Sequence, residues 1–116
     1  YTLAADRNNT ALTPYYISHH PAVMSLLLQT LKAARNQGKP VSVCGEMASL
    51  PEYVPLLVGL GFDDLSVNPA SFLECKRIIL GCDAQLDELL QRRELPSSLA
   101  GWEEMIYQKL KPYYHL

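Results

Sequence analysis

The chain has 116 residues, of which 48% are hydrophobic and 19% charged, a composition typical of one globular domain. Its net charge of −2 and pI near 5.9 argue against a nucleic-acid partner, because binding phosphate backbones needs a basic face. The longest apolar run, from Pro55 to Phe62, is far shorter than the roughly 18 residues of a membrane span. No signal segment opens the chain and its three cysteines lack CxxC spacing, so we expect a reduced, cytoplasmic setting.

The first third of the chain combines a polar segment with an amphipathic pattern. The chain begins at Tyr1 rather than Met, so we expect a piece of a longer protein. Residues 1–19 are polar and tyrosine-rich and predict a loop. Apolar residues at helical spacing then predict a helix over 21–37, which Gly38 ends. His20, directly before a proline, is interpreted as the start of this helix rather than as a ligand.

The middle of the chain alternates strand and helix patterns. Residues 41–44 form a short β-branched run and predict a buried strand. A second helix is predicted from Pro51 to about Leu60, and a second short strand from Asp64 to Val67. Asn68-Pro69 is typical of a helix N-terminus, so a third helix is predicted up to about Leu80. Short connections between such elements imply parallel strands with right-handed crossovers.

The tail, residues 83–116, carries two apolar stripes that predict amphipathic helices. Their members are Leu86, Leu89 and Leu90, and then Leu99, Trp102, Ile106 and Leu110. We favour packing of this tail against its own domain over a cap or a dimer contact.

Two of the cysteines are predicted to be core residues. Cys75 and Cys82 share one helical stripe with Phe72 and Ile79. The two thiols are separated by about 10 Å of helical rise, too far for a disulfide. His19 and His20 point to different sides and are poor candidates for a shared metal, so no metal ligand is predicted in this chain.

The third cysteine, Cys44, directly follows the first predicted strand and precedes Gly45 and Glu46. The end of a parallel strand is where an α/β protein displays its chemistry on loops held by a rigid sheet. Glycine at this point lets the backbone turn tightly and lets a ligand approach. A lone cysteine at a strand end is nevertheless more often a buried structural residue. Cys44 alone therefore leaves both interpretations open.

Four motifs that follow one another along the chain change the balance between these two interpretations of Cys44. They are Tyr1–Asn9 (YTLAADRNN), His20–Val23 (HPAV), Cys44–Ala48 (CGEMA) and Leu56–Ser66 (LLVGLGFDDLS). The series resembles the C-terminal part of the phosphoenolpyruvate-utilising enzymes, above all enzyme I of the bacterial phosphotransferase system and multiphosphoryl transfer proteins. The resemblance implies an α/β fold: residues 1–82 are the last two to three β/α units of a (β/α)8 TIM-type barrel that binds phosphoenolpyruvate. Residues 83–116 are then a helical C-terminal extension.

The resemblance also implies a reaction and roles for particular residues. A phosphoryl group passes from phosphoenolpyruvate to a protein histidine in sugar transport, and Cys44 protonates the pyruvate enolate that remains. A thiol suits this role because its reference pKa of about 8.5 keeps it protonated near neutrality. Arg7 matches the arginine that binds the substrate phosphate; its alternative is a salt bridge to Asp6 or a surface position. Gly45 holds the turn and Glu46 supports the loop through hydrogen bonds.

Several parts that the resemblance requires have no match in this chain. The Mg²⁺ ligands and the phosphorylated histidine are expected upstream of Tyr1, so the chain alone is expected to be inactive. After Met47-Ala48 the family usually has Gly-Asp, whereas this chain has Ser49-Leu50. The implied partners are phosphoenolpyruvate or pyruvate, the phosphocarrier protein HPr or an HPr-like domain, and a second copy in a homodimer.

Two alternatives stay open. Phosphoenolpyruvate synthase and pyruvate phosphate dikinase share the Cys-Gly-Glu motif and a related Asp-Arg loop. The residues of Tyr1–Asn8 nevertheless resemble enzyme I more. From a different class, the chain is a non-catalytic interaction module derived from the barrel.

Overall fold

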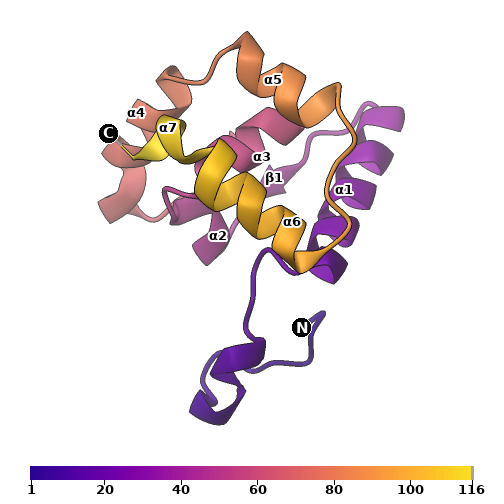
Figure 1. The fold of residues 1–116 in the computed structure, drawn as a ribbon, viewed down its shortest axis with the longest axis vertical. Coiled ribbons are helices and arrows are strands. Elements are labelled where there is room, and N and C mark those ends of the chain that lie inside the picture. Colours follow the sequence, from indigo (N-terminus) through magenta and orange to yellow (C-terminus); the bar gives the residue numbers. More distant parts are fainter. Residues whose placement is uncertain (116) are drawn as a thin grey trace.

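Two short parallel strands, β1 (Ser42–Val43) and β2 (Asp64–Leu65), form the sheet of a mostly helical structure (Figure 1). The structure is a computed structural model that describes residues 1–115. The helical elements are η1 (Thr10–Tyr15), α1 (Pro21–Asn36), α2 (Glu46–Ser49), α3 (Val54–Leu60), η2 (Pro69–Ser71), α4 (Phe72–Leu80), α5 (Ala84–Gln91), α6 (Leu99–Glu104), η3 (Met105–Lys109) and α7 (Lys111–Tyr114). None of the helices within residues 1–115 combines the length and apolar character that a bilayer span requires. The helices together with the two parallel strands confirm the predicted mixture of these elements.

Helix α1 forms where its sequence pattern predicts it. The His20 side chain accepts a hydrogen bond from the backbone N–H of Ala22 at 3.1 Å, and Pro21 occupies the first helical position. After the helix, Gly38 adopts a positive φ of 60°, which L side chains rarely adopt. The interpretation of His20 as the start of the helix is confirmed.

The second predicted helix is wrong at its start. The helix predicted from Pro51 begins only at Val54, as α3. A short helix that was not predicted, α2, precedes it, with Leu50 extended between the two (φ −92°, ψ 126°). Pro51 explains the break, because a proline disfavours the helical conformation of the residue before it. Gly61 ends α3 in the left-handed conformation, with its N–H donating to the carbonyls of Leu57 and Val58.

Strand β2 is shorter than predicted. It ends at Leu65, although the N–H of Ser66 still donates to the carbonyl of Val43 at 2.8 Å. The Asn68 side chain then caps the next helical segment by accepting from the N–H of Ser71. Ser49 also acts here, since its hydroxyl accepts a hydrogen bond from the N–H of Asn68 at 2.9 Å. Ser49, which stands where the family usually has glycine, thus links the end of α2 to the turn after β2.

The face that α4 buries differs from the predicted stripe. Cys75 and Ile78 are buried, whereas Phe72 and Ile79 are 52% and 40% exposed. Cys82 is half-buried. Cys75 and Ile78 pack with Val54 in a small cluster. The buried face of α4 therefore contains Ile78 in place of the predicted Phe72 and Ile79.

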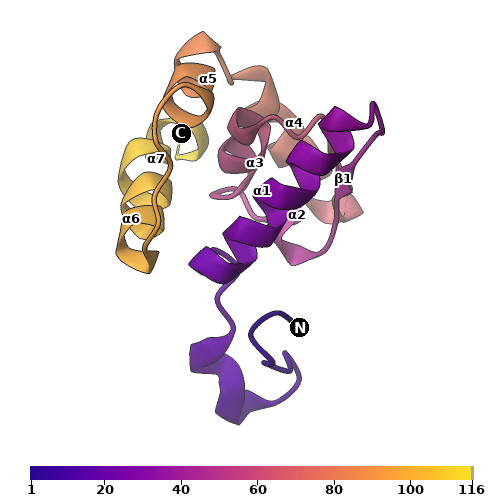
Figure 2. The same ribbon diagram turned by 90° about the vertical axis from the view of Figure 1, so that its right-hand side faces the viewer.

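The C-terminal helices complete the main core. Trp102, Ile106 and Leu110 are almost fully buried and join one cluster with residues of α1 and α3. Figure 2 shows α6 and β1 on opposite sides of α3. The tail therefore packs against its own domain on the helical side, away from the sheet.

The N-terminal segment, residues 1–19, projects below this body in both ribbon views (Figures 1 and 2). It was predicted as a loop but contains the 3₁₀-helix η1. Asn9 caps η1, because its side chain accepts from the N–H of Ala11 at 3.1 Å.

The contact between α3 and α5 predicts the effect of one substitution. A Cβ on Gly59 would overlap Leu90 Cδ1 and lie 2.9 Å from Leu86 Cγ. Gly59→Ala is therefore expected to lower the free energy of unfolding by about 1 kcal/mol, because overpacking outweighs the gain in helix propensity. Urea unfolding, followed by the fluorescence of the single tryptophan, measures this change.

Gly81→Ala is the matched control. A Cβ at that position would meet nothing closer than the Ile78 carbonyl at 3.5 Å, and the backbone is helical. Its unfolding free energy should change by no more than about 0.5 kcal/mol. Equal effects of the two substitutions would contradict the close packing of α3 on α5.

Candidate functional site

Cys44 is exposed at the carboxyl end of β1, directly after the buried Val43. Gly45 follows with a positive φ of 80° and turns the chain into α2. This conformation explains the glycine, since L side chains rarely adopt it. The interpretation of Cys44 as a buried structural cysteine is wrong.

A hollow of about 250 Å³ opens beside this turn. One wall is the strand end and the start of α2, and the other is the N-terminal segment together with the start of α1. The lining residues are Tyr1, Thr2, Leu3, Ala5, Tyr15, Tyr16, Ile17, Ser18, Val23, Cys44, Gly45, Glu46 and Met47. We call it the Cys44 hollow.

Arg7 borders a second hollow, which adjoins the first. Its lining residues are Asp6, Arg7, Asn8, Thr13, Tyr16 and Glu46. Because Tyr16 and Glu46 line both hollows, Arg7 and Cys44 lie on one continuous surface. The structure therefore brings the two principal predicted residues to the same region of the molecule.

Arg7 is exposed and makes no ion pair within residues 1–115. The neighbouring Asp6 instead accepts a hydrogen bond from the N–H of Asn8 at 2.9 Å. The salt bridge between Arg7 and Asp6 that we considered as an alternative is absent from this part of the chain. The guanidinium is consequently available to an anionic ligand.

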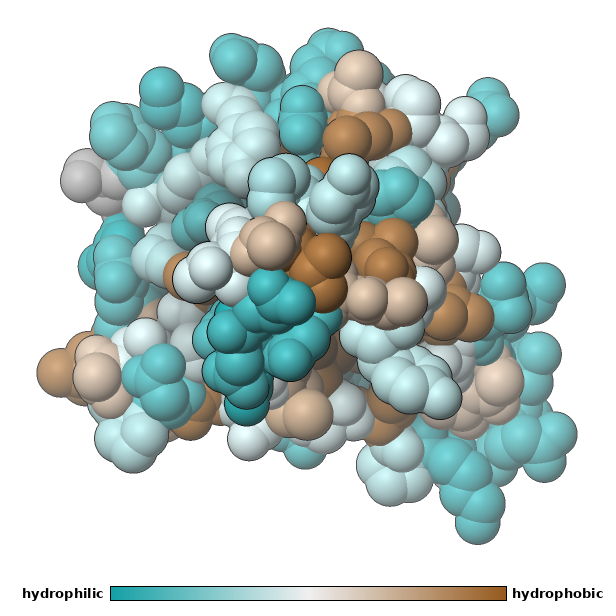
Figure 3. Space-filling view, turned by 90° about the horizontal axis from the view of Figure 1, so that it is seen from below, coloured by the Kyte–Doolittle hydropathy of each residue, from teal (hydrophilic) through white to brown (hydrophobic). Residues whose placement is uncertain are grey.

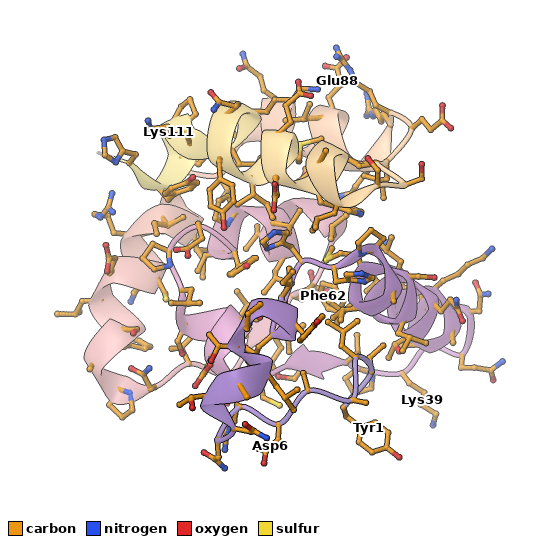
Figure 4. The ribbon with its side chains drawn as sticks, turned by 60° about the horizontal axis from the view of Figure 1, so that its bottom comes forward. Tyr1, Asp6, Lys39, Phe62, Glu88 and Lys111 are labelled. Carbon is orange, nitrogen blue, oxygen red and sulfur yellow. The ribbon has the colours of Figure 1, made fainter. Side chains whose placement is uncertain are left out.

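Figures 3 and 4 show the end of the molecule at which the N-terminal segment lies. Figure 4 places the labelled Tyr1 and Asp6 at the same end of the molecule, opposite Glu88 and Lys111. Figure 3, seen from below, shows hydrophilic atoms gathered at the centre of this face, next to hydrophobic ones. Three exposed tyrosines belong to the same segment: Tyr1, Tyr15 and Tyr16.

Glu46 lies where the sequence predicts it but lacks the predicted contacts. It is exposed in the first turn of α2, between the two hollows. Within residues 1–115 its carboxylate makes no hydrogen bond or ion pair. What the structure provides at this position is an acidic residue that lines both hollows.

The described residues do not form a metal site of their own. No three histidine, cysteine, aspartate or glutamate side chains within residues 1–115 come close enough together to hold an ion. Residues 1–115 thus offer no cluster of three such side chains to Mg²⁺.

Sequence reasoning missed the buried environment of His19. Its Nδ1 lies 2.7 Å from the Tyr53 hydroxyl, and its Nε2 lies 3.3 Å from Glu103 Oε1. Burial raises the pKa of Tyr53 above that of a free tyrosine. These partners are 34 and 84 residues away in the sequence, so no local pattern could have identified them.

The other two cysteines differ from Cys44 in their surroundings. Cys75 is buried, with Sγ 3.9 Å from the Ala48 carbonyl, and burial raises the pKa of its thiol. Cys82 donates to the Ile78 carbonyl at 3.3 Å, and burial raises its pKa to about 11. Neither thiol faces the two hollows.

Comparison with known proteins identifies consistent relatives. Residues 1–84 match the family model described as "PEP-utilising enzyme, PEP-binding domain". The chain is 37% identical over 106 residues to the phosphoenolpyruvate-protein phosphotransferase of Lactococcus lactis subsp. lactis, covering 91% of this chain and 18% of that protein. It is 40% identical over 96 residues to the protein of the same name from Cupriavidus necator, covering 78% and 16%.

A third relative, from Salmonella typhimurium, is described as "Phosphoenolpyruvate-dependent phosphotransferase system". It is 38% identical over 100 residues, which cover 86% of this chain and 13% of that protein. The chain thus spans less than a fifth of the length of the relatives it matches.

The three thiols are expected to react at different rates. At pH 8, iodoacetamide should modify Cys44 at least about tenfold faster than Cys75 or Cys82, because Cys44 is exposed and the other thiols are shielded. A pKa of about 11 leaves only about one thousandth of Cys82 as the reactive thiolate at this pH. Mass spectrometry of peptides after timed labelling measures the three rates.

Unfolding in urea provides the control for this comparison. All three cysteines should then react at similar rates, because burial no longer distinguishes them. Faster labelling of Cys75 or Cys82 in the folded chain would contradict the exposure assigned to Cys44.

Proposed function

The chain belongs to the PEP-utilising enzymes through their PEP-binding domain, and from this premise we propose that it is the C-terminal part of an enzyme I-type phosphotransferase. The reaction we propose moves a phosphoryl group from phosphoenolpyruvate to a histidine of the longer protein. The observation that carries this proposal is the continuous surface that joins Arg7 to Cys44 beside the end of β1.

Arg7 is the proposed ligand of the substrate phosphate. Its guanidinium carries a permanent positive charge and a planar set of donors that matches phosphate oxygens. Its exposure and its lack of an ion pair within residues 1–115 support this role, because no carboxylate has to be displaced when the substrate binds. In transfer, the same charge would stabilise the phosphoryl group as it leaves the enol oxygen.

Cys44 is the proposed acid for the second half of the reaction. Loss of the phosphoryl group leaves the enolate of pyruvate, which becomes the ketone when its methylene carbon receives a proton. The Sγ–H of Cys44 would donate this proton, and the thiolate would recover one from solvent. Its exposed position at the rigid end of β1, within the Cys44 hollow, supports the assignment. Gly45 supports the turn that presents the thiol.

The longer protein would supply what this chain lacks. We propose that residues 1–82 are the last two to three β/α units of a TIM-type barrel and that 83–116 extend it. Mg²⁺ would be held by ligands outside this chain, and no step above depends on it. The proposed partners are HPr or an HPr-like domain, which would accept the phosphoryl group for sugar transport, and a second copy in a homodimer. The proposed location is the cytoplasm.

The relatives reported above bear the name phosphoenolpyruvate-protein phosphotransferase or a related phosphotransferase description, which does not favour the synthase and dikinase alternatives. No feature of the described residues favours a non-catalytic module over the enzyme.

Phosphoryl transfer in the longer protein tests the proposal. With labelled phosphoenolpyruvate and Mg²⁺, label should reach a protein histidine. Arg7→Ala should slow this transfer by about 10²- to 10³-fold, the effect of removing one preorganised charge-stabilising group. Cys44→Ser should keep phosphoenolpyruvate binding but lower pyruvate formation by about 10²- to 10⁴-fold, because a hydroxyl is a much weaker acid.

Cys82→Ser is the matched control, since that thiol lies outside both hollows. It should leave transfer within about twofold of the unmodified protein. Absence of label on the folded longer protein would rule out the proposed function. Unchanged turnover in Cys44→Ser would instead reject the acid role alone.

A further inference from the structure

The N-terminal segment has few polar attachments to the rest of the molecule. Within residues 1–115, His19 makes the only side-chain hydrogen bonds that join residues 1–19 to elements beyond α1. The other side-chain hydrogen bonds of this segment are local: Asp6 accepts from the N–H of Asn8, and Asn9 accepts from the N–H of Ala11. His19 is therefore the polar anchor of the segment that carries Arg7.

Both ring nitrogens of His19 have a partner. Nε2–H donates to Glu103 Oε1 at 3.3 Å, and Nδ1 lies 2.7 Å from the Tyr53 hydroxyl. His19 as a whole is only 7% exposed, and Tyr107 packs edge-on against its ring, with the ring centroids 5.9 Å apart. Loss of either partner would leave a buried polar atom unsatisfied, which is costly.

The two partners come from different parts of the chain. Tyr53 immediately precedes α3, whose side chains form the centre of the core. Glu103 belongs to α6 in the C-terminal tail. His19 thus joins the N-terminal segment both to the core beside α3 and to the C-terminal tail.

The anchor is also close in sequence to the site. Ile17 and Ser18, directly before His19, line the Cys44 hollow. Tyr16, one residue earlier, lines both hollows and so borders the surface of Arg7. A shift of His19 would therefore move the wall that faces Cys44 and change the position of Arg7 relative to it.

We propose that His19 is a positioning residue, which Tyr53 and Glu103 hold so that the segment bearing Arg7 faces Cys44. The C-terminal helices then take part in the site without touching it, because Glu103 fixes one side of the imidazole. This inference rests on the proposed function for its effect on phosphoenolpyruvate, whereas the anchoring itself does not.

The test combines hydrogen exchange with kinetics in the longer protein. In Glu103→Ala, amide exchange in residues 1–18 should rise about tenfold, the equivalent of one charge-assisted hydrogen bond, while exchange in α1 and α3 stays unchanged. The KM for phosphoenolpyruvate should rise about tenfold, because the phosphate ligand is no longer held in place. His19→Ala should show the same pattern.

Two further variants separate positioning from general stability. Glu103→Gln keeps an oxygen that accepts from Nε2–H, so it should restore exchange and KM to within about twofold of the unmodified protein. Glu104→Ala is the matched control on the same helix, since that carboxylate is 64% exposed and lies 3.8 Å from Lys109. It should leave both measurements unchanged.

Unaltered exchange in residues 1–18 of Glu103→Ala would overturn the proposal, as would an equal increase throughout α1 and α3. Local exchange that rises while KM stays constant would overturn the positioning role as well. An unmodified protein that binds no phosphoenolpyruvate would refute the proposed function, and the exchange data would then still decide whether His19 holds the segment.

Discussion

The burial of α3 is the constraint on which the rest of the structure depends. Six of its seven residues are buried, and neighbouring elements pack on it from several sides: α2, α4, α5 and α7. Gly59 lets α5 approach closely, because a larger side chain would collide with Leu86 and Leu90. A helix so enclosed can leave the core only at great cost in buried apolar surface. Because β1 and the tail share the main core with α3, their positions are fixed relative to this helix.

The two sides of the candidate site differ in how firmly they are attached to the core around α3. Cys44 belongs to the rigid side, since β1 pairs with β2 and Val43 is buried in the main core. Arg7 belongs to a projecting segment that has little core of its own, with Ala5 as its most buried apolar residue. Its position relative to the thiol depends on a few contacts. Among them, the hydrogen bonds of His19 to Tyr53 and Glu103 are the only side-chain ones within residues 1–115 that reach beyond α1. Geometry at the site is thus only as precise as this attachment.

Local chemistry explains what the sequence could predict and what it could not. The start of α1 followed from His20 and its proline, because this signal involves adjacent residues. The residues around Cys44 left its exposure open, and only the resemblance to the PEP-utilising enzymes favoured a displayed thiol. The start of α3 was placed too early because Pro51 was interpreted as the first residue of the helix, and the short helix α2 before it was not predicted. The environment of His19 could not be predicted, since its partners meet it only after α3 and α6 have packed. Distant packing decides which face of a helix is buried, so the exposure of Phe72 was also beyond local pattern.

The central claim is that Arg7 and Cys44 contribute to one ligand site, and protection of the thiol by substrate tests it most directly. The measurement is the rate at which iodoacetamide modifies Cys44 as phosphoenolpyruvate is added to a variant of the longer protein whose acceptor histidine has been replaced. The account predicts that saturating phosphoenolpyruvate slows this modification about tenfold or more, and that Arg7→Ala shifts protection to higher concentrations. Bound phosphoenolpyruvate that leaves the labelling rate of Cys44 unchanged would contradict the account.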